Sequence, residues 1–136
     1  MANLLTGPID VLLKDADSFS QKLNSKGLKT TQLRKLHSHV TKLWLQYSTY
    51  RIADEEIRKE KLKEILEELK FVKVFLAYQQ GRDTIGYDEL NPKISQMIDS
   101  VNDEITFERF KKYVDALVAY SKYYEYVNKD NRRRGQ

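Results

Sequence analysis

The side chains that could do chemistry in this chain are few, and their spacing forms no catalytic set. The two histidines, His37 and His39, stand two residues apart, which on a helix points their rings to different sides, whereas a metal-binding pair needs a spacing of three or four. The chain has no cysteine and therefore no thiolate nucleophile or thiolate metal site. Residues 81–86, GRDTIG, lack the lysine and hydroxyl residue of a phosphate-binding P-loop. The sequence predicts no enzyme, no metal and no cofactor.

Basic side chains, by contrast, gather in a stretch without acids. Lys and Arg exceed Asp and Glu by only 24 − 20 = 4. Residues 18–53 nevertheless carry seven basic residues and no acid, and residues 83–108 carry seven acids and one lysine. This asymmetry predicts a basic side suited to a polyanion and an acidic side suited to a basic protein neighbour.

Within the acid-free stretch, Lys35 and Lys42 fall opposite the apolar stripe of an expected helix, and Arg34 lies at the border of that stripe. Two interpretations stay open. These side chains either face phosphates or line an ordinary solvated helix face. The lack of any acid nearby favours the first, because solvated faces normally mix both signs of charge.

Apolar residues recur at helical spacing along the whole chain, which predicts an all-α fold, a single compact bundle of about five helices. Residues 1–128 are expected to form the helical domain, and residues 129–136 a disordered basic tail. No apolar run reaches transmembrane length and no signal peptide is apparent, so we expect a cytoplasmic protein. Expected helix starts are Pro8, Thr30 or Thr31, Asp54, Pro92 and Thr106.

Residues 71–82, FVKVFLAYQQGR, lose almost all charge and are apolar nearly all round. Such a helix is buried on more than one side, so we expect it to be the central helix of the bundle. Gly81 is expected to end it in a left-handed conformation, which leaves Arg82 at the surface. Phe71 and Val74 lie off the main apolar stripe and are the candidates for a subunit interface.

Three motifs together resemble one protein family. Residues 30–35 (TTQLRK), 76–82 (LAYQQGR) and 110–124 (FKKYVDALVAYSKYY) occur in the order and at the separations of the small subunit of type III-A CRISPR–Cas interference complexes, the Csm small subunit family. The resemblance covers about residues 28–124. It departs from the family at Ser121, where members often carry a histidine.

The resemblance implies an all-helical, non-catalytic subunit of an antiviral effector complex. Several copies would line up beside the backbone subunits and follow the guide RNA paired to its target RNA. Target cleavage in that family belongs to a backbone subunit, and the nuclease and cyclic-oligonucleotide activities belong to the large subunit. The implied partners are therefore guide and target RNA, the backbone and large subunits, and other copies of this chain.

A subunit in this role needs contacts to the RNA backbone alone, because base pairing reads the sequence. Arg34 and Arg82 match family motifs, but each could instead pair with an acid such as Asp115 or Asp83. The candidate RNA-binding residues are Arg34, Lys35, Lys42, Arg82, Lys111, Lys112 and Lys122.

Two other functions remain open from the sequence. A helical adaptor would join protein subunits through the region of Phe71 and Val74 and the acidic residues 83–108, with little RNA contact. A small metal-dependent nuclease would need clustered carboxylates, which the spacing of the acids does not indicate.

Overall fold

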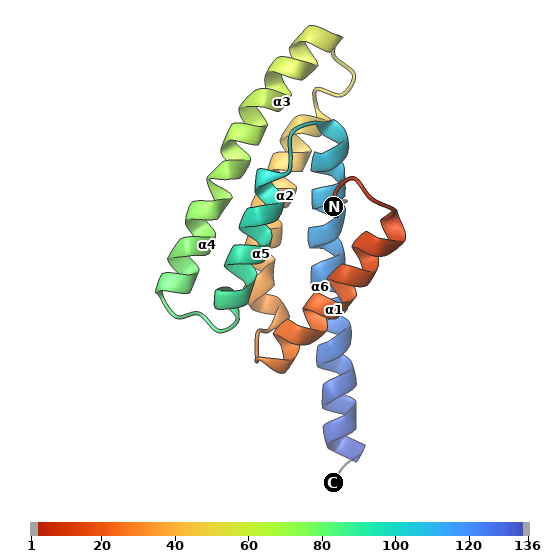
Figure 1. Ribbon diagram of the computed structural model, residues 1–136, viewed down its shortest axis with the longest axis vertical. Coiled ribbons are helices and arrows are strands. Elements are labelled where there is room, and N and C mark those ends of the chain that lie inside the picture. Colours follow the sequence, from red (N-terminus) through yellow and green to blue (C-terminus); the bar gives the residue numbers. More distant parts are fainter. Residues whose placement is uncertain (1–2, 135–136) are drawn as a thin grey trace.

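Helices occupy almost all of residues 3–134, the part of the chain that the computed structural model describes, with side chains described up to residue 129 (Figure 1). No strand occurs in this part, so the prediction of an all-α fold is confirmed. α3 and α4 are separated by Phe71 alone and follow one another as a single rod. The six helices therefore form five rods, in agreement with the expected bundle of about five helices. The helices are α1 (Ile9–Ser25), α2 (Thr30–Ser48), α3 (Glu55–Lys70), α4 (Val72–Gly81), α5 (Tyr87–Asp99) and α6 (Glu104–Arg134).

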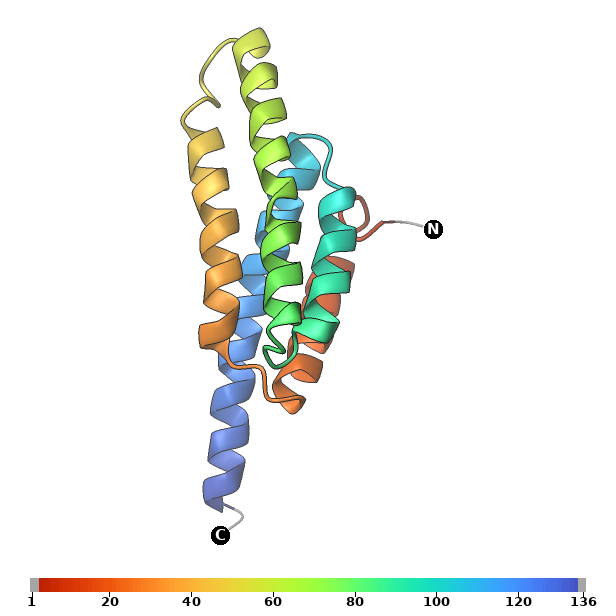
Figure 2. The ribbon, with the colours of Figure 1, turned by 90° about the vertical axis from the view of Figure 1, so that its left-hand side faces the viewer.

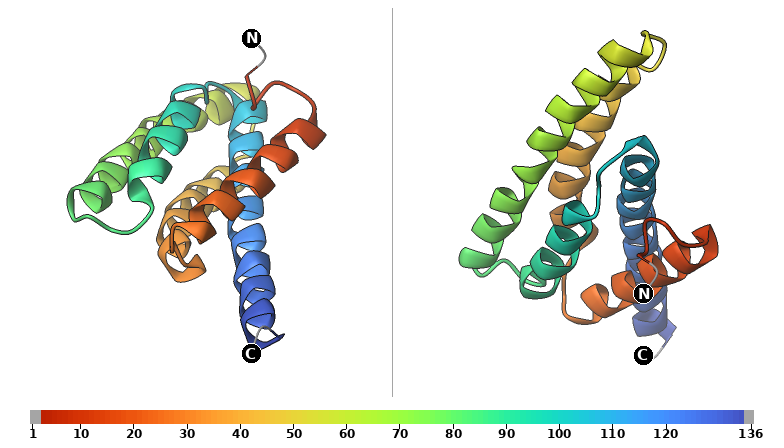
Figure 3. Two further views of the ribbon diagram at one scale, coloured as in Figure 1. Left: turned by 60° about the horizontal axis from the view of Figure 1, so that its bottom comes forward. Right: turned by 45° about the horizontal axis from the view of Figure 1, so that its top comes forward.

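α6 is the helix around which the others pack. α1 crosses it obliquely and α2 packs along it, while α5 lies beside α4 (Figures 1 and 3). α2 and the α3–α4 rod run side by side in opposite directions and reach beyond the other helices at the end where they are joined (Figure 2). The prediction that residues 71–82 form the central helix is therefore wrong, since α6 holds that place.

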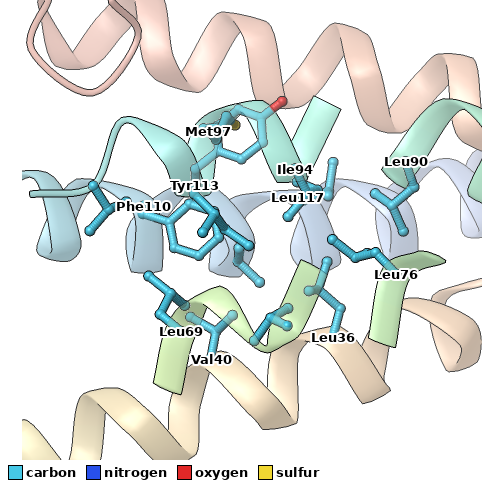
Figure 4. Packing of buried hydrophobic residues seen from close by; sticks show 14 of the residues in the cluster. Leu36, Val40, Leu69, Leu76, Leu90, Ile94, Met97, Phe110, Tyr113 and Leu117 are labelled. Atoms are coloured by element: carbon cyan, nitrogen blue, oxygen red, sulfur yellow. The ribbon is translucent and has the colours of Figure 1, made fainter. Parts of the chain in front are cut away.

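The core forms where α2, the α3–α4 rod and α5 meet α6. Phe110, Tyr113 and Leu117 of α6 are fully buried, and Figure 4 shows them facing apolar side chains from the surrounding helices. The Tyr113 hydroxyl donates a hydrogen bond of 2.7 Å to Oδ1 of Asp15, which satisfies its one polar group. The surrounding side chains in this view include Leu36, Val40, Leu69, Leu76, Ile94 and Met97.

α4 buries a single face. Val72, Leu76 and Gln79 are buried, whereas Phe71, Val74 and Tyr78 are 68%, 63% and 61% exposed. The expectation of burial on more than one side fails because the helices packed alongside α4, chiefly α5 and α2, cover its inner face alone. The apolar outer residues of this segment are surface residues of the protomer.

Two helix ends differ from the sequence prediction. Gly81 stays within α4, and the left-handed residue after the helix is Asp83 (φ 61°), while Thr84 donates its backbone N–H to the carbonyl of Gln79. α5 begins after Gly86 and carries Pro92 inside the helix rather than at its start.

α6 is capped by Asp103 instead of Thr106. The Asp103 carboxylate accepts the Thr106 backbone N–H at 2.7 Å, and the Thr106 hydroxyl accepts the backbone N–H of Asp103 in return. The backbone N–H and the hydroxyl of Thr106 both donate to the Asp103 carboxylate, and these bonds hold the pKa of Asp103 below its usual range because they favour the charged form. The cap of α2 also differs from the expectation. Thr30 is the first residue of the helix and Lys29 is its N-cap, and Glu125 of α6 accepts the backbone N–H of Thr30.

Gly86 and Gly81 provide a matched pair of substitutions. Gly86 has φ 84°, and a Cβ added there would lie 2.8 Å from the Leu28 Cβ, whereas a Cβ at Gly81 meets nothing within 4 Å. We expect Gly86→Ala to lower the free energy of unfolding by about 1–3 kcal/mol. Gly81→Ala should raise it by about 0.4–1 kcal/mol, because alanine restricts the unfolded chain. Urea denaturation checks both, and equal effects at the two positions would contradict the argument.

The basic segment that the sequence predicts to be disordered, residues 129–136, is helical as far as Arg134, where α6 ends. Arginine and lysine extend helices well and interact favourably with the negative end of the helix dipole. Residues 135–136 lie outside the described part, and the domain boundary at residue 128 stays a prediction. In residues 3–134 no helix is long and apolar enough to cross a membrane.

Candidate nucleic-acid interface

The basic and acidic stretches meet instead of forming separate sides. Lys22 of α1 and Lys26, the residue after α1, lie 3.1 and 2.7 Å from the Glu89 carboxylate of α5, and Arg51 lies 3.3 Å from Glu104 of α6. The hydrogen bonds from Lys26 and Lys22 lower the pKa of Glu89, and the bond to Glu89 raises the pKa of Lys26. Part of the positive charge therefore stabilises contacts between helices, so fewer basic side chains remain as candidates for binding a polyanion.

Lys35 and Lys42 remain exposed on α2. Neither has an ion pair with any side chain that the structure describes. Their spacing of seven residues places them on one flank of α2, about 10 Å apart along the helix axis. This flank faces the neighbouring α4 (Figure 2).

At one end of this flank Lys35 shares a pocket of about 380 Å³ with Arg82, which follows α4. The Tyr87 hydroxyl at this pocket donates a hydrogen bond of 2.8 Å to the carbonyl of Gln32. Burial raises the pKa of Tyr87 to about 12, so this hydroxyl stays a neutral donor. The Arg82 guanidinium lies 5.6 Å from the ring centroid of Tyr78. It has no acid partner among the described side chains, and so the alternative of a pair with Asp83 is not seen.

Further along, Lys42 shares a second pocket of about 480 Å³ with Phe71 and Phe75. The His39 ring packs on Phe75 with ring centroids 4.7 Å apart. Glu68 is the one acid among the residues that line the two pockets. We call this seam the α2–α4 groove, with Lys35 and Arg82 at one end and Lys42 and Phe71 at the other.

The three predicted lysines of α6 each have an acid nearby. Lys111 lies 2.6 Å from Asp115, Lys112 lies 3.3 Å from Glu108, and Lys122 lies 3.9 Å from Glu125. The side chain of Lys111 is only 15% exposed. These pairs make the α6 lysines weaker candidates for phosphate than the cations of the α2–α4 groove.

Arg34 and Val74 lie outside the groove as well. Arg34 stands three residues before His37, whose Nε2 lies 2.8 Å from Oδ1 of Asp115, and so it lies on the flank of α2 that faces α6. Asp115 binds Lys111 and His37, and Arg34 has no ion pair with a described side chain. Val74 is on the outer face of α4. The structure thus brings together Lys35, Lys42, Arg82 and Phe71.

Some groove residues were missed from the sequence. His39 and Gln46 follow Lys35 by four and eleven residues and lie on the same flank, a signal that helical spacing would have provided. Phe75 and Tyr87 belong to separate helices, and only their packing reveals that they line the groove. In the described residues no three histidine or acidic side chains converge on a possible metal site.

Comparisons with known proteins agree with the motifs. The family model described as Csm2 Type III-A matches residues 7–126. A protein of Streptococcus thermophilus named "CRISPR system Cms protein Csm2" is 30% identical over 98 residues, which is 71% of this chain and 73% of that protein. No solved structure gives a significant match. The resemblance inferred from the three motifs is confirmed, and the chain belongs to the Csm2 family, the small subunits of type III-A CRISPR systems.

Proposed function

We propose that this chain is a non-catalytic subunit of a type III-A effector complex in the cytoplasm, and that it contacts the backbone of the guide and target RNA through the α2–α4 groove. The observation that carries the proposal is that Lys35 and Arg82 line one pocket and Lys42 lines a second pocket along the same seam between α2 and α4, all three without ion pairs to described side chains. Cationic side chains that contact phosphates and read no bases suit a subunit of a complex in which the guide RNA recognises the sequence by base pairing.

The groove also has the aromatic surface that unpaired nucleotides use. Phe71 is exposed at one end of the groove, and Tyr78, which is exposed on the outer face of α4, packs on Arg82 at the other end. Bases stack on such rings without regard to sequence. We therefore expect the isolated protein to bind single-stranded RNA weakly, with no sequence preference and with strong salt dependence.

A second function is favoured by the outer face of α4. Phe71, Val74 and Tyr78 have helical spacing of three and four residues and form an exposed apolar stripe. A stripe of this kind suits contact with a neighbouring subunit or another copy of this chain. In an adaptor of this kind, RNA contact would be minor.

Ultraviolet cross-linking of the assembled complex to target RNA separates the two functions. We expect RNA adducts in peptides covering residues 31–46 and 78–87, which line the α2–α4 groove, and none in α1. Mass spectrometry of the digested complex identifies the modified peptides. Adducts absent from the whole chain, in a complex that retains it, would favour the adaptor and overturn RNA contact.

A further inference from the structure

A second groove lies between α3 and the start of α6, separate from the α2–α4 groove. Its volume is about 610 Å³. It is lined by Tyr47, by α3 from Arg58 to Lys70, and by the loop before α6 together with Glu104. None of its lining residues belongs to the three motifs that identify the family.

The floor of this groove is apolar. Leu62 and Leu66, one helical turn apart on α3, are half-buried and pack against the core, and Val101 is buried at the opposite wall. Tyr47 closes one end, and burial raises its pKa, so it presents no charge. A floor of this kind gains free energy by covering apolar side chains.

The rim along α3 is cationic. Lys63 and Lys70 are exposed and have no ion pair with any described side chain, whereas Lys59 lies 3.1 Å from Glu55. The acids on the opposite wall are already engaged. Asp103 caps α6, and Glu104 lies 3.3 Å from Arg51. Arg58 also lines the groove and donates to the backbone carbonyl of Arg51 at 3.5 Å. The exposed lysines without a partner among the described side chains are thus Lys63 and Lys70, two turns and about 10 Å apart along α3.

We propose that this groove docks an acidic amphipathic segment of another protein subunit of the effector complex. The complementary segment carries an apolar side chain over Leu62 and Leu66, flanked by two carboxylates about 10 Å apart, as at positions i and i+7 of a helix. The inference rests on the assignment to an effector complex, and it does not depend on RNA contact in the α2–α4 groove.

Protein is favoured over RNA here because acids alternate with the lysines on α3. Glu60, Glu64 and Glu67 lie between Lys59 and Lys70, and Glu67 itself lines the groove. A polyphosphate would meet these like charges, whereas α2 presents its cations in a stretch without acids. A protein segment with two spaced carboxylates reaches Lys63 and Lys70 on either side of Glu67, whereas Glu60 and Glu64 lie outside the groove lining.

A photo-cross-linking amino acid in place of Leu62 tests the occupant within the assembled complex. We expect an adduct with an Asp- or Glu-containing peptide of a different protein subunit. An adduct with RNA alone, an adduct with a second copy of this chain, or no adduct in a complex that retains this chain would each overturn the proposal.

Charge reversal gives a second readout. Lys63→Glu with Lys70→Glu should lower incorporation into the complex about 10-fold, because two ion pairs become repulsive contacts. The free protein should bind single-stranded RNA within about 2-fold of its normal affinity. Lys14→Glu, an exposed lysine on α1, is the control and should leave incorporation unchanged. Normal incorporation of the double variant would overturn the proposal, as would equal loss of RNA binding by the free protein.

Discussion

Target-RNA binding by the assembled complex should fall about 100-fold at physiological salt when Lys35, Lys42 and Arg82 are all changed to Glu, because each cation that meets a phosphate releases counterions. The three side chains are exposed and have no ion pair with described side chains, so the substitutions leave the helices intact. Binding titrations at several salt concentrations check the result. The slope of log affinity against log salt should become shallower by about 0.7 per lost contact to a single strand, or about 0.9 per contact to a duplex.

Single substitutions provide the control for this prediction. Lys35→Glu should weaken binding severalfold, and Lys14→Glu, the same change on α1, should leave it within about 2-fold. Arg34→Glu tests the flank of α2 that faces α6. A larger loss for Arg34 than for Lys35 would move the RNA surface to that flank and to the α6 lysines. An unchanged affinity for the triple variant would refute the α2–α4 groove as an RNA site.

Phe110→Ala should lower the free energy of unfolding by about 3–5 kcal/mol, while Phe71→Ala should change it by less than about 0.5 kcal/mol. Phe110 is fully buried among apolar side chains of the core, and its removal leaves a cavity that the packed core cannot close (Figure 4). Phe71 is 68% exposed at the junction of α3 and α4, so its loss removes little packing. Urea denaturation followed by circular dichroism measures both values.

The same pair of variants separates folding from assembly. If the exposed ring contacts a neighbouring subunit, Phe71→Ala should remain folded and yet enter the effector complex less efficiently. Val74→Ala, on the same outer stripe, is expected to act in the same direction. A destabilisation by Phe71→Ala as large as that by Phe110→Ala would show that α4 is covered in the protomer, against the exposure seen here.

The sequence predicts the helices well because helical periodicity is a local property. Helix starts are expected at Pro8 and Asp54, and these residues are the N-caps of α1 and α3. Capping is less predictable, since it depends on side-chain geometry within one turn. Thr106 is the expected cap of α6, whereas Asp103 caps it and exchanges hydrogen bonds with Thr106.

What the sequence does not reveal is which face another helix covers. The apolar character of residues 71–82 is real, but periodicity does not show that α4 has neighbours on one side alone. The pairs of Lys22 and Lys26 with Glu89 join residues more than sixty positions apart, so counting charge along the chain overestimates the free cations of α1. The α2–α4 groove could likewise be predicted only in part from the sequence, because α2 supplies one wall and α4 the other.

The packing of α1 against α6 makes folding depend on contacts between distant parts of the chain. Tyr113 binds Asp15 and Tyr124 binds Asp17, so side chains about one hundred residues apart must meet before either pair forms. During synthesis, Leu12, Ala16 and Phe19 of α1 keep an uncovered apolar face until α6 has left the ribosome. The nascent chain therefore completes its core late in translation, and in that interval a chaperone or a partner subunit has access to α1.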